Sequence, residues 1–556
     1  MGMITGGELL VRTLLKADVR TVFALHGAHL ETMFQACLDH KIPIIDVRQE
    51  VAAGYAAEAY ARTTRRLGVA MITAGPGFTN VVSSIANAYL DRTPVLYLSG
   101  AAALFNAETN NLQAGIDQLA IAKPITKWAH QITLTRDIPR LVAQAIRVAT
   151  SGPTGPVLLD LPQDVLGAQI DEASVAVPEK ILLDAAPAPP DRLVEEALKL
   201  LESAARPVIV VGSGAWQSGC EIALKRFAEH SGIPVYSDFQ AHGLLPSSHP
   251  LYGGTTHKLS DLTNATGRPD VVLALGLRFG LFTLGASDKL IPNAAKLIHV
   301  EIDPKEINRL RPADLAIVAD PHEMLCKLIN QSTGIVWPDR KEWQRVVAQA
   351  KIDRKKRAAD DLARPTPPIH PYQAVTAIAD ALPKESIVIG DGAEAYHWFN
   401  EVVRQENPGG YITHGFLGDV GFGIGLSIGA QVAHPERRVL CLAGDGAVGF
   451  NIAEFDTMVR FNLPIVVVVM NNRSWAASQH YQEAISGANR VTHTQLGGAR
   501  YDEVAKGFGA FGAYVTRIED LAPALKAAFA SGKPACVNVE IDVKPLPPEL
   551  HLLMSR

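Results

Sequence analysis

Cysteine is scarce in this sequence, and its few occurrences lie far apart. Only five cysteines occur among 556 residues, and no two of them have a CxxC spacing. An odd number at such wide separations argues against a disulfide framework and against a cysteine-based zinc site, and it is typical of a reducing compartment. We therefore expect a cytoplasmic protein.

Long hydrophobic runs and an excess of basic residues are lacking as well. The longest unbroken apolar run, residues 464–470, is far shorter than the roughly 20 residues of a membrane-spanning helix. The stretch MGMITGGELL has no charged flank followed by an apolar segment, so we expect no signal peptide. The formal net charge is −5 and no cluster of Lys and Arg stands out, which argues against nucleic-acid and membrane partners.

What the sequence does contain is an alternation of apolar, β-rich runs with amphipathic helical stretches. Strands that are apolar throughout and are separated by helices predict parallel sheets covered on both faces. The alternation is interrupted by a proline-rich stretch at 185–191 and by a charged, proline-rich stretch at 353–371. We therefore predict an α/β protein with three doubly wound parallel-sheet domains, at residues 1–182, 190–350 and 366–556.

Two short motifs give the first sign of chemistry. Asp445 follows the apolar run of RVLCLAGDG, and Asn472 follows that of LPIVVVVMNN. Because these runs are expected to be parallel strands joined by a crossover helix, their ends meet at the same sheet edge. A carboxylate, an amide oxygen and a nearby backbone carbonyl suit Mg²⁺, and the adjacent Gly444 and Gly446 let the backbone approach a diphosphate. Either motif alone is common in turns, but together they predict a Mg²⁺-diphosphate site.

This pair of motifs resembles the fingerprint of thiamine diphosphate (ThDP) enzymes. Glu50 adds to the resemblance, because it ends the expected buried strand of IPIIDVRQE and precedes a helix of small apolar residues. The resemblance implies that Glu50 shares a proton with the aminopyrimidine ring of ThDP; a carboxylate that merely sits near a helix start is the alternative. It also implies that Glu50 and the metal site meet across a subunit interface. A homodimer would then be the smallest active unit, and we expect a homotetramer.

The resemblance extends over the whole chain, and some segments resemble one particular group of ThDP enzymes more than the others. TAGPGFTN, LDRTPVL and GPVLLDLPQDV resemble the acetolactate synthase-like ThDP enzymes, which have a pyrimidine-binding, a middle and a diphosphate-binding domain in this order. LHGAHLETMFQACLDH, NLQAGIDQLAIAKPITKWAH and HGFLGDVGFGIG are more similar to benzaldehyde lyase. This similarity implies a lyase or carboligase that cleaves and forms 2-hydroxy ketones from aldehydes, with ThDP and Mg²⁺ as cofactors.

The resemblance also assigns roles to single residues. The metal ligands would be Asp445, Asn472 and the carbonyl of Ser474. The other cofactor contacts would come from Glu50, Gly418, Val420, Gly446, Ala447 and Trp475. The catalytic residues would be Glu50, His29, Gln113, Tyr396 and His414. The substrate site would be lined by Ala28, His29, Gln113, Gln163, Tyr396 and Ala477. His29 would relay a proton to or from the substrate hydroxyl that Gln113 orients, although a lone histidine at such a turn is often only a surface residue.

Departures from the family pattern keep other functions open. Gln163 stands where benzaldehyde lyase has a tryptophan. GLRFGLFTLG lacks the second arginine of the FAD-binding synthases, and GSGAWQSG does not have the spacing of GxGxxG, so we expect no FAD. The alternatives are an acetolactate synthase-like enzyme, a 2-keto acid decarboxylase, and a cofactor-binding scaffold without turnover. The presence of Glu50, Asp445 and Asn472 argues against the scaffold.

Overall fold

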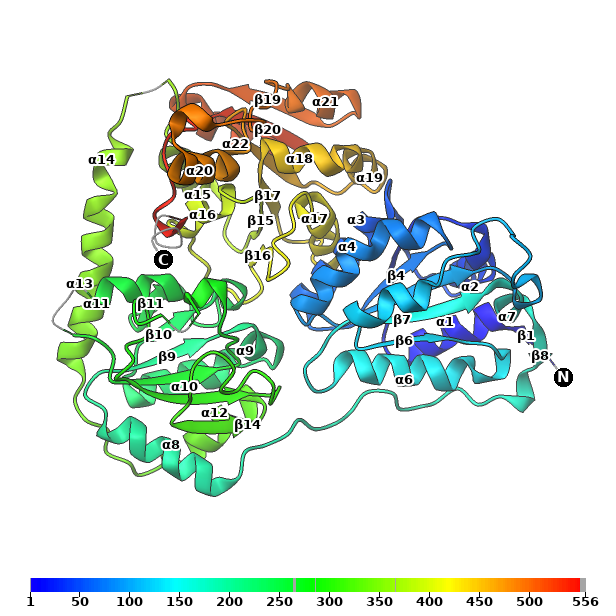
Figure 1. Cartoon of the computed structure of the whole chain (residues 1–556), viewed down its shortest axis with the longest axis horizontal. Coiled ribbons are helices and arrows are strands. Elements are labelled where there is room, and N and C mark those ends of the chain that lie inside the picture. Colours follow the sequence, from blue (N-terminus) through cyan, green and yellow to red (C-terminus); the bar gives the residue numbers. More distant parts are fainter. Residues whose placement is uncertain (1, 264–266, 286, 366, 551–556) are drawn as a thin grey trace.

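Three six-stranded sheets, one in each third of the chain, form the framework of the protein (Figure 1). The computed structural model describes residues 2–263, 267–285, 287–365 and 367–550. Neighbouring strands in all three sheets run parallel. The structure therefore confirms the prediction of three α/β domains with parallel sheets. A small antiparallel sheet of β1 (Met3–Thr5) and β8 (Gln169–Asp171) is an addition that we did not predict.

The N-terminal sheet has the strand order β3-β2-β4-β5-β7-β6. Its strands are β2 (Val22–Ala24), β3 (Ile44–Asp46), β4 (Gly68–Ile72), β5 (Val95–Ala101), β6 (Trp128–Gln131) and β7 (Val157–Pro162). Its helices are α1 (Gly6–Lys16), α2 (Glu31–Asp39), α3 (Glu50–Thr64), α4 (Pro76–Leu90), α5 (Gln118–Ala122), α6 (Ile138–Thr150) and α7 (Gln163–Gly167). In β4, Val69 and Met71 pack toward α1, α2 and α6, whereas Ala70 and Ile72 pack toward α3 and α4. Both faces of the sheet are thus covered, which explains why its strands are apolar throughout.

The middle sheet has the strand order β11-β10-β9-β12-β13-β14. Its strands are β9 (Pro207–Val211), β10 (Val235–Ser237), β11 (Tyr252–Thr255), β12 (Val271–Leu275), β13 (Lys296–Glu301) and β14 (Leu315–Val318). The helices around it are α8 (Asp191–Ser203), α9 (Ser213–Gln217), α10 (Glu221–Ser231), α11 (Ser260–Thr263), α12 (Pro321–Gln331) and α13 (Lys341–Arg357). Trp343 and Val347 of α13 complete the core on one face of this sheet, so α13 belongs to the middle domain although it extends beyond residue 350.

The C-terminal sheet has the strand order β16-β15-β17-β18-β20-β19. Its strands are β15 (Ile387–Asp391), β16 (Tyr411–Thr413), β17 (Val439–Gly444), β18 (Val466–Asn471), β19 (Phe511–Val515) and β20 (Ala535–Glu540). Its helices are α15 (Pro371–Ala381), α16 (Ala395–Asn400), α17 (Gly423–Ala433), α18 (Asp445–Asn451), α19 (Phe455–Arg460), α20 (Ala476–Ser486), α21 (Tyr501–Gly507) and α22 (Ile518–Ala530). The connection between β17 and β18 is therefore two short helices, and not one continuous crossover helix.

The two expected breaks in the chain differ from each other. Residues 175–190 contain no helix or strand and carry the chain from the N-terminal to the middle domain along one edge of the molecule (Figure 1). The stretch 353–371 is helical in its first half, because α13 continues to Arg357 and α14 spans Ala359–Leu362. Lys, Arg and Ala favour helix, and the prolines begin only at Pro365. None of the helices in the described ranges combines the length and the apolar character that crossing a membrane requires.

The N-terminal and C-terminal domains share one hydrophobic core, in which α3 packs against α17 (Figure 1). Two glycines of α17 let the helices approach closely. A Cβ atom at Gly429 would lie 1.9 Å from the carbonyl oxygen of Ala56, and one at Gly425 would lie 3.0 Å from Tyr55 Cβ. The first distance is far below a van der Waals contact. The carbonyl oxygen of Ala56 is a backbone atom, so it cannot move away without the rest of α3.

Gly429→Ala is therefore expected to destabilise the protein. Separating α3 from α17 should cost about 1–3 kcal/mol, more than the roughly 1 kcal/mol that alanine gains over glycine in a helix. The melting temperature should fall by several degrees. Gly507→Ala is the matched control, because a Cβ atom at Gly507 in α21 has no neighbour within 4 Å. An unchanged melting temperature for Gly429→Ala would contradict the close packing of the two helices.

Candidate active site

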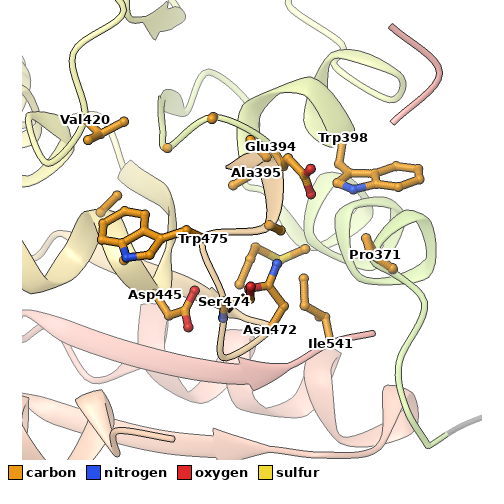
Figure 2. Close-up of a pocket in the computed structure, with 18 of the residues that line it drawn as sticks. Pro371, Glu394, Ala395, Trp398, Val420, Asp445, Asn472, Ser474, Trp475 and Ile541 are labelled. Carbon is orange, nitrogen blue, oxygen red and sulfur yellow. Dashed lines mark hydrogen bonds between the residues drawn. The ribbon is translucent and has the colours of Figure 1, made fainter. Parts of the chain in front are cut away.

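A cavity of about 230 Å³ opens at the carboxyl-terminal edge of the C-terminal sheet (Figure 2). Its walls come largely from the segments that follow β15, β17, β18 and β20, which are neighbouring parallel strands. Ligands of open α/β sheets bind at this edge. The sequence-predicted residues that line the cavity are Val420, Asp445, Gly446, Ala447, Asn472, Ser474, Trp475 and Ala477. The structure thus brings most of the predicted cofactor contacts together.

Asp445 is the first residue of α18, directly after β17. Its side chain is buried, with 3% of its surface exposed. Burial raises the pKa of Asp445 to about 6, although the backbone amides of Gly446, Arg473 and Ser474 favour the charged form. A buried carboxylate whose donors are backbone amides suits a cation as a further partner.

Asn472 and Ser474 lie in a tight turn after β18. The amide of Ser474 donates to Asn472 Oδ1 at 3.1 Å, and Arg473 between them has a left-handed φ of 59°. A carboxylate, a side-chain amide and a backbone carbonyl are the hard oxygen donors that Mg²⁺ prefers. No three His, Cys, Asp or Glu side chains are grouped for metal binding in the described part of the chain. Mg²⁺ at this place would therefore depend on phosphate oxygens to complete its coordination, which fits a diphosphate ligand.

Gly446 and Trp475 shape one end of the cavity. A Cβ atom at Gly446 would lie 2.4 Å from Trp475 Cζ3, so only glycine lets the indole lie across the start of α18. The indole also meets Phe450 edge to face at 6.2 Å between ring centroids. Figure 2 shows Trp475 and Val420 on the same side of the cavity.

Val420 is held in place by a buried carboxylate below its loop. Asp391 accepts hydrogen bonds from the amides of Gly421 at 3.0 Å and Gly423 at 2.8 Å. Gly418, at φ 68°, starts the turn but does not line the cavity. The loop is thus built so that Val420 is the residue it presents to the cavity.

A second group of predicted residues gathers around the turn 73–77 of the N-terminal domain, after β4. His29 Nδ1 lies 2.9 Å from Thr73 Oγ1, and burial lowers the pKa of His29. Gln113 packs against the same turn, because a Cβ atom at Gly75 would lie 3.1 Å from Gln113 Cβ. Two residues that are far apart in sequence thus flank one turn at the carboxyl edge of the N-terminal sheet.

Glu50 lies at the same turn, but not at the end of a strand as we expected. The strand β3 ends at Asp46, and Glu50 is the first residue of α3. Its side chain is 8% exposed, and its Oε2 accepts a hydrogen bond from Asn80 Nδ2 at 2.9 Å. A Cβ atom at Gly77 would lie 3.5 Å from Glu50 Oε1, so the carboxylate reaches the turn that His29 and Gln113 flank.

The last two predicted residues of this domain are exposed at the same sheet edge. Ala28 precedes His29, and Gln163 begins α7 directly after β7. Pro162 is paired with Ala101 at the end of β5, and a Cβ atom at Gly100 in β5 would meet His29 Cβ at 2.6 Å. Gln163 therefore lies at the same edge of the N-terminal sheet as His29.

The two halves of the candidate site are separate within one chain. Among the residues that the structure describes, none from the N-terminal domain lines the cavity beside Asp445, so Glu50, His29 and Gln113 do not reach it. The resemblance to ThDP enzymes implied this separation, since it placed the two halves on different subunits.

Tyr396 and His414 form a third group, which the structure places beside the cavity and not in its wall. Their rings meet edge to face at 4.6 Å. Tyr396 Oη lies 2.5 Å from His397 Nε2, and His397 Nδ1 lies 2.7 Å from Glu549 Oε2. Burial would raise the pKa of Glu549, but the nearby His397 and His257 outweigh burial and lower that pKa to about 2. No sequence signal pairs Glu549 with His397, because the two residues are 152 positions apart in the chain.

Glu549 is therefore expected to anchor the last described segment of the chain. Glu549→Gln removes the charge of a buried pair, which should cost on the order of 3 kcal/mol. The variant should melt several degrees lower and lose its C-terminal segment faster to carboxypeptidase. Glu519→Gln is the control, since the pair of Glu519 with Arg517 is exposed to solvent and should contribute little to stability. Equal protease resistance of the two variants would contradict the anchoring role.

One further ionisable pair lies at the cavity, and the sequence analysis missed it. Glu394 lines the cavity, and its Oε1 lies 2.7 Å from His480 Nδ1. Burial alone would lower the pKa of His480, but the Glu394 carboxylate outweighs it and raises that pKa. His480 thus compensates a carboxylate that would otherwise repel a diphosphate.

Comparison with known proteins identifies the family. Three descriptions of thiamine pyrophosphate enzymes match in order: the N-terminal TPP binding domain at residues 4–121, the central domain at 194–328 and the C-terminal TPP binding domain at 391–539. Thiamine pyrophosphate is another name for ThDP. The last match contains Asp445, Asn472 and Ser474.

Similar proteins match over almost the whole chain. A probable acetolactate synthase of Mycobacterium bovis is 32% identical over 537 residues, covering 96% of this chain and 95% of that protein. A probable acetolactate synthase large subunit of Methanocaldococcus jannaschii is 30% identical, covering 97% and 92%. The acetolactate synthase isozyme 1 large subunit of Escherichia coli is 29% identical, covering 97% and 94%. These matches support the broader resemblance noted in the sequence, and none of them supports the narrower one to benzaldehyde lyase. The chain belongs to the thiamine pyrophosphate enzymes and is of the acetolactate synthase large-subunit type.

Proposed function

We propose that this enzyme forms and cleaves the carbon–carbon bond of 2-hydroxy ketones, with uncharged aldehydes as its substrates. The observation that carries the proposal is the lack of an unpaired cationic side chain, both among the residues assigned to the substrate and in the described wall of the cavity. His480, beside the cavity, is paired with Glu394. Among the described residues that line the cavity there is no Lys, Arg or His. The carboxylate of a 2-keto acid would lose its hydration there without gaining a counter-charge, whereas an aldehyde has no such cost.

The N-terminal residues that we assign to the substrate support the same choice. His29 is half-buried, and burial lowers its pKa, which favours the neutral imidazole at neutral pH. Gln113 and Gln163 are uncharged amides. Together these side chains offer hydrogen bonds to a carbonyl or hydroxyl group, but no positive charge for a carboxylate.

The second candidate function is condensation of 2-keto acids. It is favoured by the names of the relatives, which are acetolactate synthases. A decarboxylase of the same family would also use a 2-keto acid.

The cofactor would be held by the C-terminal domain. ThDP held there would supply a carbon nucleophile and an electron sink for the reaction at the substrate carbonyl. We assign the side chains of Asp445 and Asn472 and the carbonyl of Ser474 to Mg²⁺, and the amides of Gly446 and Ala447 to the diphosphate. Val420, with Gly418 and Trp475, would support the aminopyrimidine ring.

The N-terminal residues would handle protons. Glu50 would hold the proton shared with the aminopyrimidine ring. Thr73 engages His29 Nδ1 and so leaves Nε2 free to take a proton from, or return it to, the substrate hydroxyl. Gln113 would orient that hydroxyl, and Tyr396 with His414 would close the far side of the substrate.

These roles require a homodimer in which each N-terminal domain completes the C-terminal cavity of its partner. The loop near Gln113 supports this arrangement, because it exposes apolar side chains that a partner would cover. These are Phe105 (76% exposed), Leu112 (81%), Ile116 (43%) and Ile121 (40%). Exposed apolar groups of this density mark protein interfaces. The homotetramer, and the expected lack of FAD, remain predictions that light scattering and the visible spectrum of the purified enzyme would test.

The substrate class can be tested directly. The ThDP- and Mg²⁺-loaded enzyme would be assayed for cleavage of benzoin and acetoin, for acyloin formation from formaldehyde and benzaldehyde, and for turnover of pyruvate and benzoylformate. We expect kcat/KM for the aldehydes or acyloins to exceed that for the keto acids. The opposite order would favour the synthase or decarboxylase function.

Gln163 is expected to set the size of the preferred aldehyde. An indole at this position would offer an aromatic substrate a flat apolar wall, worth about 1 kcal/mol or several-fold in kcat/KM. Gln163→Trp should therefore raise the preference for benzaldehyde over acetaldehyde in competition assays. Gln169→Trp is the control, because Gln169 is also exposed but lies in β8. If the preference does not rise, Gln163 is not part of the substrate wall.

A further inference from the structure

A second cavity, of about 440 Å³, lies between the middle and C-terminal domains. It is bounded by the edge strand β11, by α13, and by residues from α15 and from the end of α16. No described residue lines both this cavity and the one beside Asp445. The proposed reaction does not use it.

The charges that line this cavity are strongly unbalanced. Among the described residues that line it, five are cationic and one is a carboxylate, Glu401. The cations are Lys258, Lys351, Arg354, Lys355 and Arg404. Glu401 is already engaged, because Lys258 Nζ donates a hydrogen bond to it inside the protein.

Two of the remaining cations have carboxylate partners outside the cavity wall. Arg354 binds Asp261 through Nε at 2.8 Å, and Arg404 binds Asp380 at 3.1 Å near the surface. Lys355 has no ion pair within the described ranges of the chain, and neither does Lys351.

Lys351 lies close to other positive charges and has no negatively charged partner in the described part of the chain. Its ammonium group donates to the carbonyl oxygen of Tyr252 at 2.8 Å, which is a neutral partner. Burial lowers the pKa of Lys351, and the nearby Arg354 and Lys355 lower it further. The cavity thus holds positive charges that the protein itself does not neutralise.

The backbone of β11 is shaped for close approach to these cations. The register between β10 and β11 shifts so that Gly253 has no partner residue, and Gly254 has a φ of 124°. A Cβ atom at Gly254 would lie 3.2 Å from Lys258 Cγ and 3.6 Å from an Arg354 guanidinium nitrogen. Glycine at this position leaves room between the edge strand and the cationic side chains. The amides of an edge strand also lack strand partners on their outer side, so they are available to an anion.

We infer that this cavity binds a small molecule with a diphosphate group, either free or as part of a nucleotide. A diphosphate carries the two or more negative charges that Lys351 and Lys355 leave uncompensated, and its several oxygens match converging Lys, Arg and backbone donors. The hydroxyl groups of Ser247 and Tyr372 line the same cavity and add neutral donors, whereas Thr376 Oγ1 already donates to the carbonyl oxygen of Tyr372.

The cavity is also linked to the candidate active site. Asn400 lines it, and Asn400 Nδ2 donates to Glu549 Oε2 at 3.2 Å. The same Glu549 oxygen lies 2.7 Å from His397, the partner of Tyr396. Glu549 and His397 therefore connect Asn400, in the wall of this cavity, to Tyr396.

The test is titration calorimetry at low ionic strength with sodium diphosphate, ADP and AMP, using enzyme already saturated with ThDP and Mg²⁺. Bound ThDP is measured in parallel, so that displacement of the cofactor is recognised. We expect diphosphate and ADP to bind at one site per chain, without loss of ThDP, and AMP to bind at least ten-fold more weakly. Equal affinity of diphosphate and ADP would indicate that only the diphosphate is recognised, and tighter ADP binding would indicate a nucleotide.

Variants of neighbouring lysines locate the site. Lys351→Gln and Lys355→Gln should each weaken binding by ten-fold or more. Lys356→Gln is the matched control, because Lys356 is the next residue of α13 and does not line the cavity. The inference fails if the wild-type holoenzyme binds neither probe, if binding releases ThDP, or if the three variants bind alike. None of these outcomes depends on which substrate the enzyme turns over.

Discussion

Replacing Asp445 by alanine is expected to abolish Mg²⁺-dependent binding of ThDP. Asp445 is the one charged ligand in the proposed metal site. Without it, the protein would offer Mg²⁺ only the neutral oxygens of Asn472 and Ser474, so the metal and the diphosphate it bridges to the protein would bind weakly. Changes in residues that merely support a metal ligand weaken metal binding by about 10–100-fold, so removal of this ligand should cost at least as much.

The measurement can use a residue already in the cavity. Trp475 lines the cavity beside Gly446, so its fluorescence should report ThDP binding in titrations with and without Mg²⁺. Asp542→Ala is the control, because Asp542 lines the same cavity but is not assigned to the metal. Undiminished Mg²⁺-dependent affinity in Asp445→Ala would refute the metal site, and equal losses in both variants would point to a nonspecific effect of charge.

Replacing Glu50 by glutamine is expected to leave the fold intact and to slow cofactor activation by about 10²–10⁴-fold, the usual contribution of a positioned acid or base. The amide of glutamine can still accept the hydrogen bond of Asn80, so the start of α3 should keep its structure. An amide cannot exchange the proton that the aminopyrimidine ring needs. Hydrogen–deuterium exchange at the thiazolium carbon of bound ThDP measures this step, and a wild-type exchange rate would exclude the role.

The same two variants test whether the site is shared between subunits. In a mixed dimer of Glu50→Gln and Asp445→Ala chains, one site would combine the intact Glu50 of one chain with the intact Asp445 of the other. Co-expressed chains should therefore regain activity that neither variant has alone. If both residues acted within one chain, no mixture would regain activity.

The sequence was sufficient to predict three parallel sheets with both faces covered by helices. Runs such as the one before Asn472 are apolar at every position, which requires both faces of a strand to be covered, and helical stretches between such runs require parallel connections. Parallel strands end at one edge, so Asp445 and Asn472 had to lie close together. The same reasoning holds for His29, Glu50 and Gln163, which all follow strands of the N-terminal sheet.

Local boundaries were less well predicted, because short-range signals compete there. Glu50 begins a helix four residues after its strand has ended, and the charged stretch after residue 353 continues α13 to Arg357. Propensity and the position of the first proline decide such boundaries, and a boundary drawn from composition alone misses them.

Only the tertiary structure showed the pairs Glu394–His480 and His397–Glu549, and the cationic cavity at Lys351 and Lys355. Each of these joins segments that neither a strand register nor a helical period relates. Their contacts depend on how loops, linker helices and domains pack after the sheets have formed. Periodicity and strand polarity, which are local properties of a sequence, determined the sheets and the edges where the chemistry lies; long-range packing decided which charged groups compensate each other at those edges.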